Sequence, residues 1–372
     1  MHLNSIKLTG FKNYASEAFE FSEKMNCIVG LNGMGKTNLL DAIYYLCMCK
    51  SRFSGTDRNL LRRTDEEKSD FFRLEGHFLK NEKPQKIVAK VAPPKKEIEK
   101  NGSVYPRLSD HIGLLPVVFI VPDDTNLLLE GSESRRLLID NVLSQMHQEY
   151  LINLMSYNRI LKQRNAALKA FAEKGTYNAS LIQTYDQQLI APAAIIFSYR
   201  KEFESNFSPL LENLYKEISG DAEPVSCHYK SPLLKDDLET ILKENKDKDR
   251  IMGRTTSGLH KDDLQFSMKG FPLKRFASQG QLKSFVLAVK LAQYEILRKE
   301  KQEKPILLLD DIFDKLDDKR VQLLLELLHR DDFGQIFLTD THEERAESFV
   351  REFSEDYKKY TIEHGTKKAG GT

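Results

Sequence analysis

The segment that most constrains the fold of this 372-residue chain is Gly30–Thr37, which reads GLNGMGKT. It fits G-x-x-x-x-G-K-[ST] at every fixed position, and this pattern forms a loop that cradles nucleotide phosphates. A short strand pattern, Asn26–Val29, precedes the loop, and apolar residues at helical spacing follow from Leu39 to Leu46. A chance glycine-rich turn is the alternative, and the flanking strand and helix patterns argue against it. The segment therefore predicts a strand, a phosphate loop and a helix in succession.

Each residue type in the loop has a physical role in holding a triphosphate. Glycines at 30, 33 and 35 allow the backbone to wrap closely, so that N–H groups can point at phosphate oxygens. Lys36 is expected to bind the β- and γ-phosphates, and the Thr37 hydroxyl to ligate Mg²⁺. The predicted nucleotide-binding residues are Gly30, Leu31, Asn32, Gly33, Met34, Gly35, Lys36, Thr37 and Asn38.

A second chemical signal is Ile306–Asp311, which reads ILLLDD. A buried strand ending in two acids presents carboxylates at its carboxyl end, where ligands bind in α/β sheets. Asp310 is expected to hold Mg²⁺ directly or through water, and Asp311 to orient or deprotonate the attacking water. An acidic cap for the following helix is the alternative, and the phosphate loop weighs against it.

A third signal is Ser278-Gln279-Gly280-Gln281, at the start of a predicted helix over residues 279–299. Ser278 and the free N–H groups of the first helical turn could form an anion site, to which Gly280 and Gln281 would also contribute. A simple serine N-cap is the alternative that these residues alone leave open.

Composition limits the classes of function. With 56 basic and 55 acidic residues the net charge is +1, so any site for a polyanion must be a local patch. No window approaches the ~18 apolar residues of a membrane span, and no signal peptide is recognisable, so a cytoplasmic protein without membrane contact is expected. The four cysteines, Cys27, Cys47, Cys49 and Cys227, are expected to be buried reduced thiols.

The order of patterns predicts an α/β domain interrupted by helices. Strand patterns occupy both ends of the chain, whereas helical patterns occupy roughly 134–220, with a break at Gly175–Asn178 and a kink or restart at Pro192. We expect residues 1–124 and 253–366 to form an ATPase head, 125–252 a helical insertion lobe, and 367–372 a flexible tail.

The motifs, in this order, resemble those of the ABC/SMC-type P-loop ATPases, and more closely those of the RecF family. Leu8–Tyr14 (LTGFKNY) is similar to the family's L-x-x-F-R-N-Y turn, and Gly258–Asp263 (GLHKDD) to its G-P-H-R-D-D. Further matches are Gly30–Ile43, Ser278–Gln281, and Leu308–Asp317 with its RecF-like double aspartate and a D-loop at Asp314–Asp317. The sequence departs from the family pattern at Leu259, which replaces a proline, and at Phe53, where a basic residue is expected. No glutamine marks a Q-loop, and Asp123 or Asp124 lies at the comparable place.

The resemblance implies an ABC/SMC-type head with a helical lobe and a weak ATPase activity that uses ATP and Mg²⁺. It implies an ATP-induced homodimer in which Ser278 completes the partner's γ-phosphate site, with His342 as a candidate γ-phosphate switch or, alternatively, a solvated histidine. It further implies sequence-independent binding of gapped or junction DNA, and RecO and RecR as partners in loading RecA. Candidate DNA contacts are Arg52, Arg58, Arg62 and Arg63 and the strand pair over Lys80–Lys96, with a solvated basic face balanced by acids as the alternative. Another ABC-type subunit and a non-hydrolysing, ATP-gated clamp remain alternative functions.

Overall fold

The computed structural model describes residues 1–64, 68–220, 223–315, 318–328, 332–354 and 356–368. The chain forms two compact units. The first contains Met1–Asp124, Glu217–Gly220 and Lys283–Thr372, and the second contains Thr125–Lys216 and Asp221–Leu282. In this division a segment of the first unit ends at Asp124, and residues 253–282 belong to the second unit.

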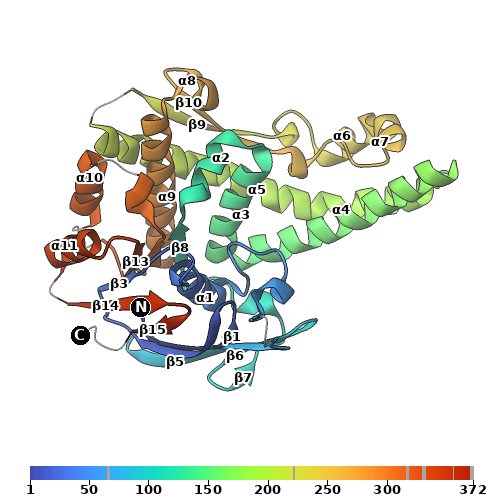
Figure 1. Ribbon diagram of the computed structural model, residues 1–372. Coiled ribbons are helices and arrows are strands. Elements are labelled where there is room, and N and C mark those ends of the chain that lie inside the picture. The colour runs from blue at the N-terminus through green and yellow to red at the C-terminus, as the bar shows by residue number, and fades with distance from the viewer. Residues whose placement is uncertain (65–67, 221–222, 316–317, 329–331, 355, 369–372) are drawn as a thin grey trace. The chain divides into compact units, whose positions relative to one another are not determined.

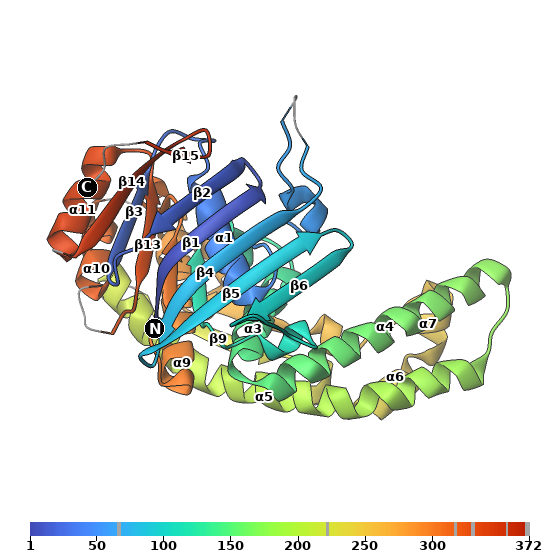
Figure 2. The ribbon, with the colours of Figure 1, turned by 90° about the horizontal axis from the view of Figure 1, so that it is seen from below.

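The first unit contains two six-stranded sheets (Figures 1 and 2). One has the order β2-β1-β4-β5-β6-β7 with antiparallel pairing. Its strands are β1 His2–Phe11, β2 Tyr14–Glu20, β4 Phe72–Lys80, β5 Lys83–Ala92, β6 Lys95–Lys100 and β7 Ser103–Val104. A tight turn at Asn101-Gly102, expected from this dipeptide, joins β6 to β7, and both residues have positive φ.

The other sheet has the order β15-β14-β3-β13-β12-β8 and is parallel except for β15. Its strands are β3 Met25–Val29, β8 Val117–Ile120, β12 Ile306–Leu309, β13 Ile336–Asp340, β14 Tyr357–Glu363 and β15 Thr366–Lys367. Because β3, β13, β12 and β8 are parallel, their carboxyl ends lie at one edge of the sheet, which is where the loops with functional signals begin.

Helix α1, Lys36–Met48, lies in the core that both sheets share. Its buried Leu39, Ile43 and Leu46 belong to the same cluster as Leu8 of β1 and Leu308 of β12. The described part of this unit also contains α9 Gln279–Lys301, whose first residues belong to the second unit, α10 Asp318–Leu328 and α11 Glu343–Phe353, which contacts β3 and β13. The phosphate loop is therefore held by a buried strand and a buried helix.

The second unit is mainly helical, as the sequence predicts for its middle part (Figure 2). Its helices are α2 Asn126–Leu129, α3 Ser132–Met146, α4 Gln148–Lys174, α5 Ala179–Ser219, α6 Leu238–Glu244, α7 Lys246–Met252 and α8 Leu273–Phe276, and its small sheet contains β9 Val225–Lys230, β10 Asp263–Met268 and β11 Phe271–Pro272. Short 3₁₀ turns in the two units are η1 Asp57–Leu60, η2 Leu108–Asp110, η3 Pro122–Thr125, η4 Pro232–Leu234, η5 Leu259–Lys261 and η6 Ile312–Lys315.

A buried arginine joins three segments of the second unit. Arg200 on α5 is only 3% exposed, and its guanidinium contacts Asp262 at 2.6 Å and Asp140 on α3 at 2.8 Å. Since a buried charge is tolerated only when it is paired, these contacts specify which segments pack around α5.

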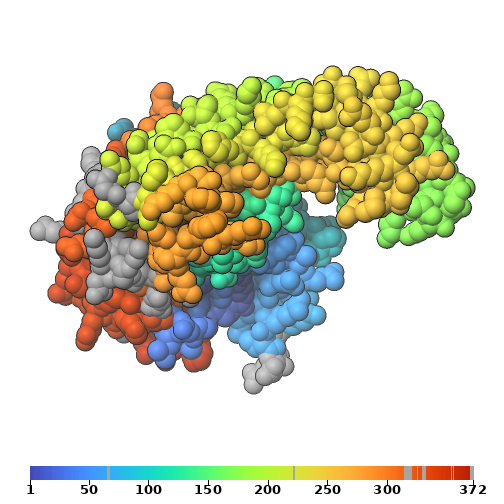
Figure 3. Space-filling view, turned by 90° about the horizontal axis from the view of Figure 1, so that it is seen from above, coloured from blue at the N-terminus to red at the C-terminus, as the bar shows by residue number. Residues whose placement is uncertain are grey.

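A second buried arginine joins α4 to α5 and α7. Arg164 on α4 contacts Asp249 on α7 at 2.7 Å and Asp186 on α5 at 2.6 Å. Helix α7 packs against α4, and the space-filling view shows the α6–α7 segment, in yellow, next to the green end of α4 (Figure 3). Paired charges therefore specify the neighbours of α4 as they do those of α5.

Some local features differ from the expectations. Of the kink or restart expected at Pro192, the restart does not occur: α5 continues through both Pro192 and Pro209, and apolar residues such as Ile196 and Phe207 bury one face of the helix. The sequence does not predict strands β14 and β15, because YKKYTIE lacks a clear apolar alternation. Lys367 belongs to β15, and residues 369–372 of the expected tail lie outside the described residues.

The cysteines agree with the prediction made from composition. All four cysteines are free and buried, as predicted. In the part of the chain that the structure describes, no helix is long and apolar enough to cross a membrane.

Candidate nucleotide-binding site

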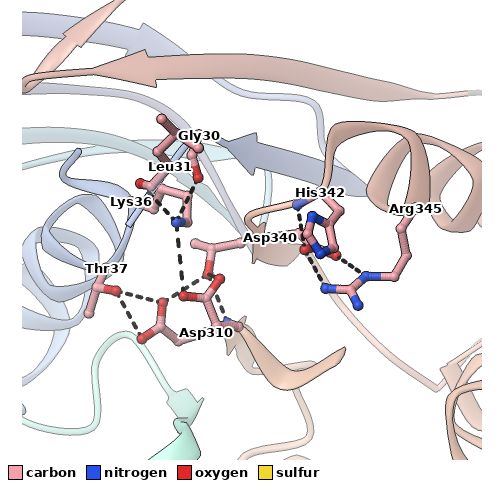
Figure 4. Close-up of polar contacts among 10 residues, drawn as sticks. Gly30, Leu31, Lys36, Thr37, Asp310, Asp340, His342 and Arg345 are labelled. Carbon is pink, nitrogen blue, oxygen red and sulfur yellow. Dashed lines mark hydrogen bonds and ion pairs between the residues drawn. The ribbon is translucent and has the colours of Figure 1, made fainter. Parts of the chain in front are cut away.

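The phosphate loop follows β3 and leads directly into α1, as the sequence predicts (Figure 4). Gly30, Gly33 and Gly35 have φ values of 150°, 80° and 117°, a region that residues with a Cβ rarely occupy. Lys36 is the first residue of α1, and its ammonium group donates to the carbonyl oxygens of Gly30 at 2.9 Å and Leu31 at 3.3 Å. The lysine therefore folds back over the loop at the position where phosphate oxygens would bind.

Thr37 and Asp310 meet at the carboxyl edge of the parallel sheet. The Thr37 hydroxyl lies 2.8 and 3.0 Å from the two carboxylate oxygens of Asp310, to which it donates (Figure 4). Thr339 on β13, the strand between β3 and β12, donates to the same carboxylate at 2.8 Å. Both residues predicted to hold Mg²⁺ thus lie together.

The chemistry of this group fits a divalent cation with oxygen ligands. Asp310 is 4% exposed, and burial raises its pKa to about 6, while hydrogen bonds from Thr339 and Thr37 lower it only in part. The raised pKa means that too little positive charge lies near this carboxylate to offset its burial. A bound cation would supply that charge. Mg²⁺ prefers one or two carboxylate or hydroxyl ligands together with water and phosphate oxygens.

Asp311 lies next to the Lys36 side chain. Its carboxylate is 3.9 Å from the Lys36 ammonium nitrogen, and its backbone N–H donates to Thr339 Oγ1 at 2.9 Å. The residue has φ of 41°, so the chain turns sharply directly after Asp310. This turn places the two acids in different surroundings: Asp310 is buried against threonines, whereas Asp311 is half-buried near the lysine. Different environments are what allow adjacent carboxylates to have different roles.

Ser278 is exposed and caps α9. Its backbone N–H donates to Gln281 Oε1 at 2.7 Å, and the Gln281 N–H donates to Ser278 Oγ at 3.3 Å. This reciprocal pair is a capping box, so the N-cap interpretation of these residues is correct. The cap uses a lone pair of Oγ and not the hydroxyl proton, so the geometry is also compatible with phosphate binding at Ser278. Of the D-loop prediction, Leu316 and Asp317 lie outside the described residues.

His342 follows β13 and precedes α11, with an exposed side chain. Its backbone N–H donates to Asp340 Oδ1 at 2.9 Å. Asp340 is buried and accepts two further bonds from Arg345, at 2.6 and 2.8 Å (Figure 4). The Asp340–Arg345 pair, which no sequence pattern indicates, fixes the turn that carries His342.

The candidate DNA-binding arginines differ in their surroundings. The Arg52 guanidinium lies 2.8 Å from Asp124, a buried carboxylate that also binds Lys290 at 3.0 Å. Arg58 and Arg63 are exposed, and Arg62 is half-buried. Asp124, one of the two candidates for the Q-loop position, is thus already paired with the side chains of Arg52 and Lys290.

Three lysines of the β5–β6 region are paired with acids. Lys86 contacts Glu75, Lys90 contacts Glu99, and Lys96 contacts Asp57. Because these lysines are paired with acids, the strand pair is better interpreted as a charge-balanced surface than as a DNA-binding face.

The parallel sheet, the phosphate loop and the Thr37–Asp310 contact define a P-loop ATPase head of the ABC/SMC type. The family model described as the RecF/RecN/SMC N terminal domain matches residues 2–366. Together with the relatives below, this match shows that the chain belongs to the RecF family.

Curated relatives named DNA replication and repair protein RecF match nearly the whole chain. The protein from Flavobacterium johnsoniae is 44% identical over 97% of this chain and 100% of its own length. The protein from Phocaeicola vulgatus is 40% identical over 98% of this chain and 97% of its own length.

Solved structures agree with this assignment. A structure of the recombination mediator protein RecF with ATP in the RecFOR pathway aligns with TM-score 0.87 and 28% identity, covering 99% of this chain and 98% of that one. An Smc head bound to the C-winged helix domain of ScpA aligns with TM-score 0.58 and 16% identity, covering 100% of this chain and 98% of that one. This similarity supports the fold class alone.

We expect the Asp310→Asn variant without nucleotide to be more stable than the unchanged protein at pH 7, by about 1–3 kcal/mol. The reason is that burial raises the pKa of this carboxyl by about two units, which corresponds to a cost of roughly 3 kcal/mol for the charged form. The folded state binds more protons than the unfolded state between the ordinary pKa of 3.8 and about 6, so the unfolding free energy falls as pH rises through this window. An asparagine amide does not titrate, so the variant should not show that fall. Urea unfolding from pH 4 to 8 measures both effects, and a less stable variant at pH 7 would contradict the assigned environment.

Proposed function

We propose that this chain is an ATP-dependent DNA-binding protein of recombinational repair, acting as its RecF relatives are named to act. The observation that carries the proposal is the Thr37–Asp310 contact beside a complete phosphate loop, in a chain that belongs to the RecF family. The RecF neighbour solved with ATP supports ATP as the nucleotide. Thr37 and Asp310 would hold Mg²⁺, which supplies positive charge to the β- and γ-phosphate oxygens.

The hydrolytic step follows from the placement of two side chains, Lys36 and Asp311. Lys36 moves from the loop carbonyls to the phosphate oxygens and neutralises their charge. Asp311, beside Lys36, orients the attacking water and accepts its proton. Aspartate is one methylene shorter than the glutamate of most ABC proteins, and a base misplaced by about 1 Å can cost on the order of 100-fold in rate. We therefore propose weak, switch-like ATP hydrolysis.

Hydrolysis is coupled to assembly in this proposal. The Ser278 hydroxyl, with Gly280 and Gln281 in the first turn of α9, binds the γ-phosphate held by the partner subunit. Charge-assisted hydrogen bonds across the interface form only while the γ-phosphate is present, so hydrolysis opens the homodimer. His342, beside the Asp340–Arg345 pair, is proposed to sense the γ-phosphate.

The proposed ligand of the dimer is gapped or junction DNA, bound through phosphates without base readout. RecO and RecR are the proposed partners, because the neighbouring RecF structures belong to the RecFOR pathway. Loading of RecA in the cytoplasm is the resulting function. The alternatives are another ABC-type subunit and an ATP-gated clamp that does not hydrolyse ATP.

An Asp311→Asn variant separates a hydrolysing protein from a clamp that needs only ATP binding. We expect ATP affinity within about threefold of the unchanged protein and phosphate release slowed by at least about 100-fold, because the water no longer has a proton acceptor. Phosphate release is measured with and without gapped duplex DNA, across protein concentrations. Equal release by both proteins would favour the non-hydrolysing clamp.

A Ser278→Asp variant tests the composite site without removing the helix cap. Aspartate is as good an N-cap as serine, so α9 should keep its stability, whereas its carboxylate repels a γ-phosphate. We expect ATP binding by the monomer to persist, and ATP-induced dimerisation, followed by sedimentation, to weaken at least about tenfold. Ser205→Asp on α5, an exposed serine outside the site, is the matched control. Dimerisation equal to that of the control would rule out Ser278 as a phosphate contact.

The exposed pair Arg58 and Arg63 can be tested as DNA contacts through salt dependence. Removing one phosphate contact should reduce the slope of log affinity against log salt by roughly 0.9. The double variant Arg58→Gln, Arg63→Gln, measured with ATP and gapped DNA, should therefore show a slope smaller by about 1–2. Lys235→Gln with Lys243→Gln removes the same charge from exposed positions elsewhere. An unchanged slope would exclude the arginine pair.

A further inference from the structure

Two turns from opposite ends of the chain meet at one carbonyl of the phosphate loop. The carbonyl oxygen of Met34 accepts a hydrogen bond from Asn13 Nδ2 at 2.8 Å and another from the backbone N–H of Gly365 at 2.9 Å. Asn13 belongs to the turn between β1 and β2, and Gly365 to the turn between β14 and β15. Both lone pairs of this carbonyl are therefore engaged by residues outside the loop.

The neighbouring carbonyl of the loop is held in the same way. The hydroxyl of the buried Tyr14 donates to the Gly35 carbonyl oxygen at 2.9 Å. Asn13 is itself fixed, because its Oδ1 accepts from Asn38 Nδ2 on α1 at 2.8 Å. The turn over residues 13–14 thus holds two successive peptide groups of the loop.

The C-terminal turn packs on these elements backbone against backbone. A Cβ added at Gly365 would lie 2.4 Å from the Asn13 carbonyl oxygen, and the residue has φ of +76°. A Cβ added at Gly30 would lie 2.4 Å from the carbonyl oxygen of Ile362 on β14. Approaches this short leave room only for glycine.

The orientation of these carbonyls determines where the loop N–H groups point. In a trans peptide the C=O and N–H bonds of one plane point in opposite directions. Anchoring the Met34 carbonyl therefore turns the N–H of Gly35 away from the two turns, and anchoring the Gly35 carbonyl does the same for the N–H of Lys36. These N–H groups belong to the part of the loop that cradles phosphates.

We propose that Asn13 and the β14–β15 turn at Gly365 are positioning elements of the nucleotide site, which pre-orient the loop N–H groups toward the phosphates. A C-terminal hairpin far from the loop in sequence would thereby set phosphate affinity. The inference rests on the proposed binding of ATP and extends it to residues that do not touch the nucleotide.

The hairpin has anchors of its own, so its contact with the loop can be altered separately. Lys367 Nζ donates to the Ala18 carbonyl oxygen on β2 at 2.8 Å, and the Lys368 N–H donates to the Thr361 carbonyl oxygen at 2.9 Å. A small change at Gly365 should therefore displace the turn from the loop without unfolding the strand pair.

The test compares Gly365→Ala with Gly102→Ala. Gly102 lies in the β6–β7 turn with φ of +84° and has nothing within 4 Å of an added Cβ, so it reproduces the backbone strain without the loop contact. Affinities for ATP, ADP and AMP are measured by competition with a fluorescent nucleotide, and Tm reports folding. For Gly365→Ala we expect ATP and ADP affinity to fall together at least about tenfold. AMP affinity should change less than about twofold, because AMP has only the α-phosphate and lacks the β-phosphate to which the loop N–H groups also donate.

Asn13→Asp provides a second variant if Gly365→Ala does not fold. It keeps the Oδ1 acceptor for Asn38 and removes the donor to Met34, so the same selective fall in ATP and ADP affinity is expected. The proposal is overturned if Gly365→Ala and Asn13→Asp bind ATP as Gly102→Ala does, or if AMP affinity falls as much as ATP affinity. Failure of the unchanged protein to bind ATP would instead overturn the proposed function, and this inference with it.

Discussion

The hydrogen bond between Thr37 and Asp310 is the contact that most directly requires the strand arrangement of the first unit. It joins residues 273 positions apart in sequence, one at the start of α1 and one directly after β12. It can form only if β3 and β12 are parallel members of one sheet and end at the same edge. Strand β13 lies between them and contributes Thr339 to the same carboxylate, so three strands from both ends of the chain meet at one charged group.

This contact has a cost that the surrounding core offsets. The carboxylate follows a strand whose four residues are fully buried, and burial opposes its ionisation, which raises its pKa. The apolar residues of β12, β3 and α1 supply the stabilisation, at roughly 25 cal/mol for each Å² removed from water. The buried charge lowers the stability of the protein without ligand. A cation that binds with a triphosphate relieves this penalty, so the lost stability is recovered as binding free energy.

Local patterns in the sequence are sufficient for the loop, for Asp310 and for most strands and helices, because each depends on neighbouring residues. Residues whose partners are distant are not predictable in this way. Thr339 and the Asp340–Arg345 pair have ordinary sequence surroundings, and the turn motif that contains Asn13 does not indicate its contact with the phosphate loop. Only the folded chain reveals these contacts. Pro192 inside α5 shows the converse, since tertiary burial outweighs a strong local signal.

The segment Gly258–Asp263, which carries part of the family resemblance, has a structural explanation within the second unit. Asp262 accepts from Arg200, and Asp263 from Arg135 on α3 at 2.7 Å. His260 lies between Tyr157 and the Thr255 carbonyl oxygen, and burial lowers its pKa to about 4, so it is neutral at physiological pH. The histidine is neutral and hydrogen-bonded, and both aspartates are paired with arginines. Structural contacts within the second unit are therefore sufficient to explain why these residue types occur in this segment. The proposed chemistry of the nucleotide therefore depends on the loops of the first unit, and on Ser278 at the start of α9, a helix whose residues are divided between the two units.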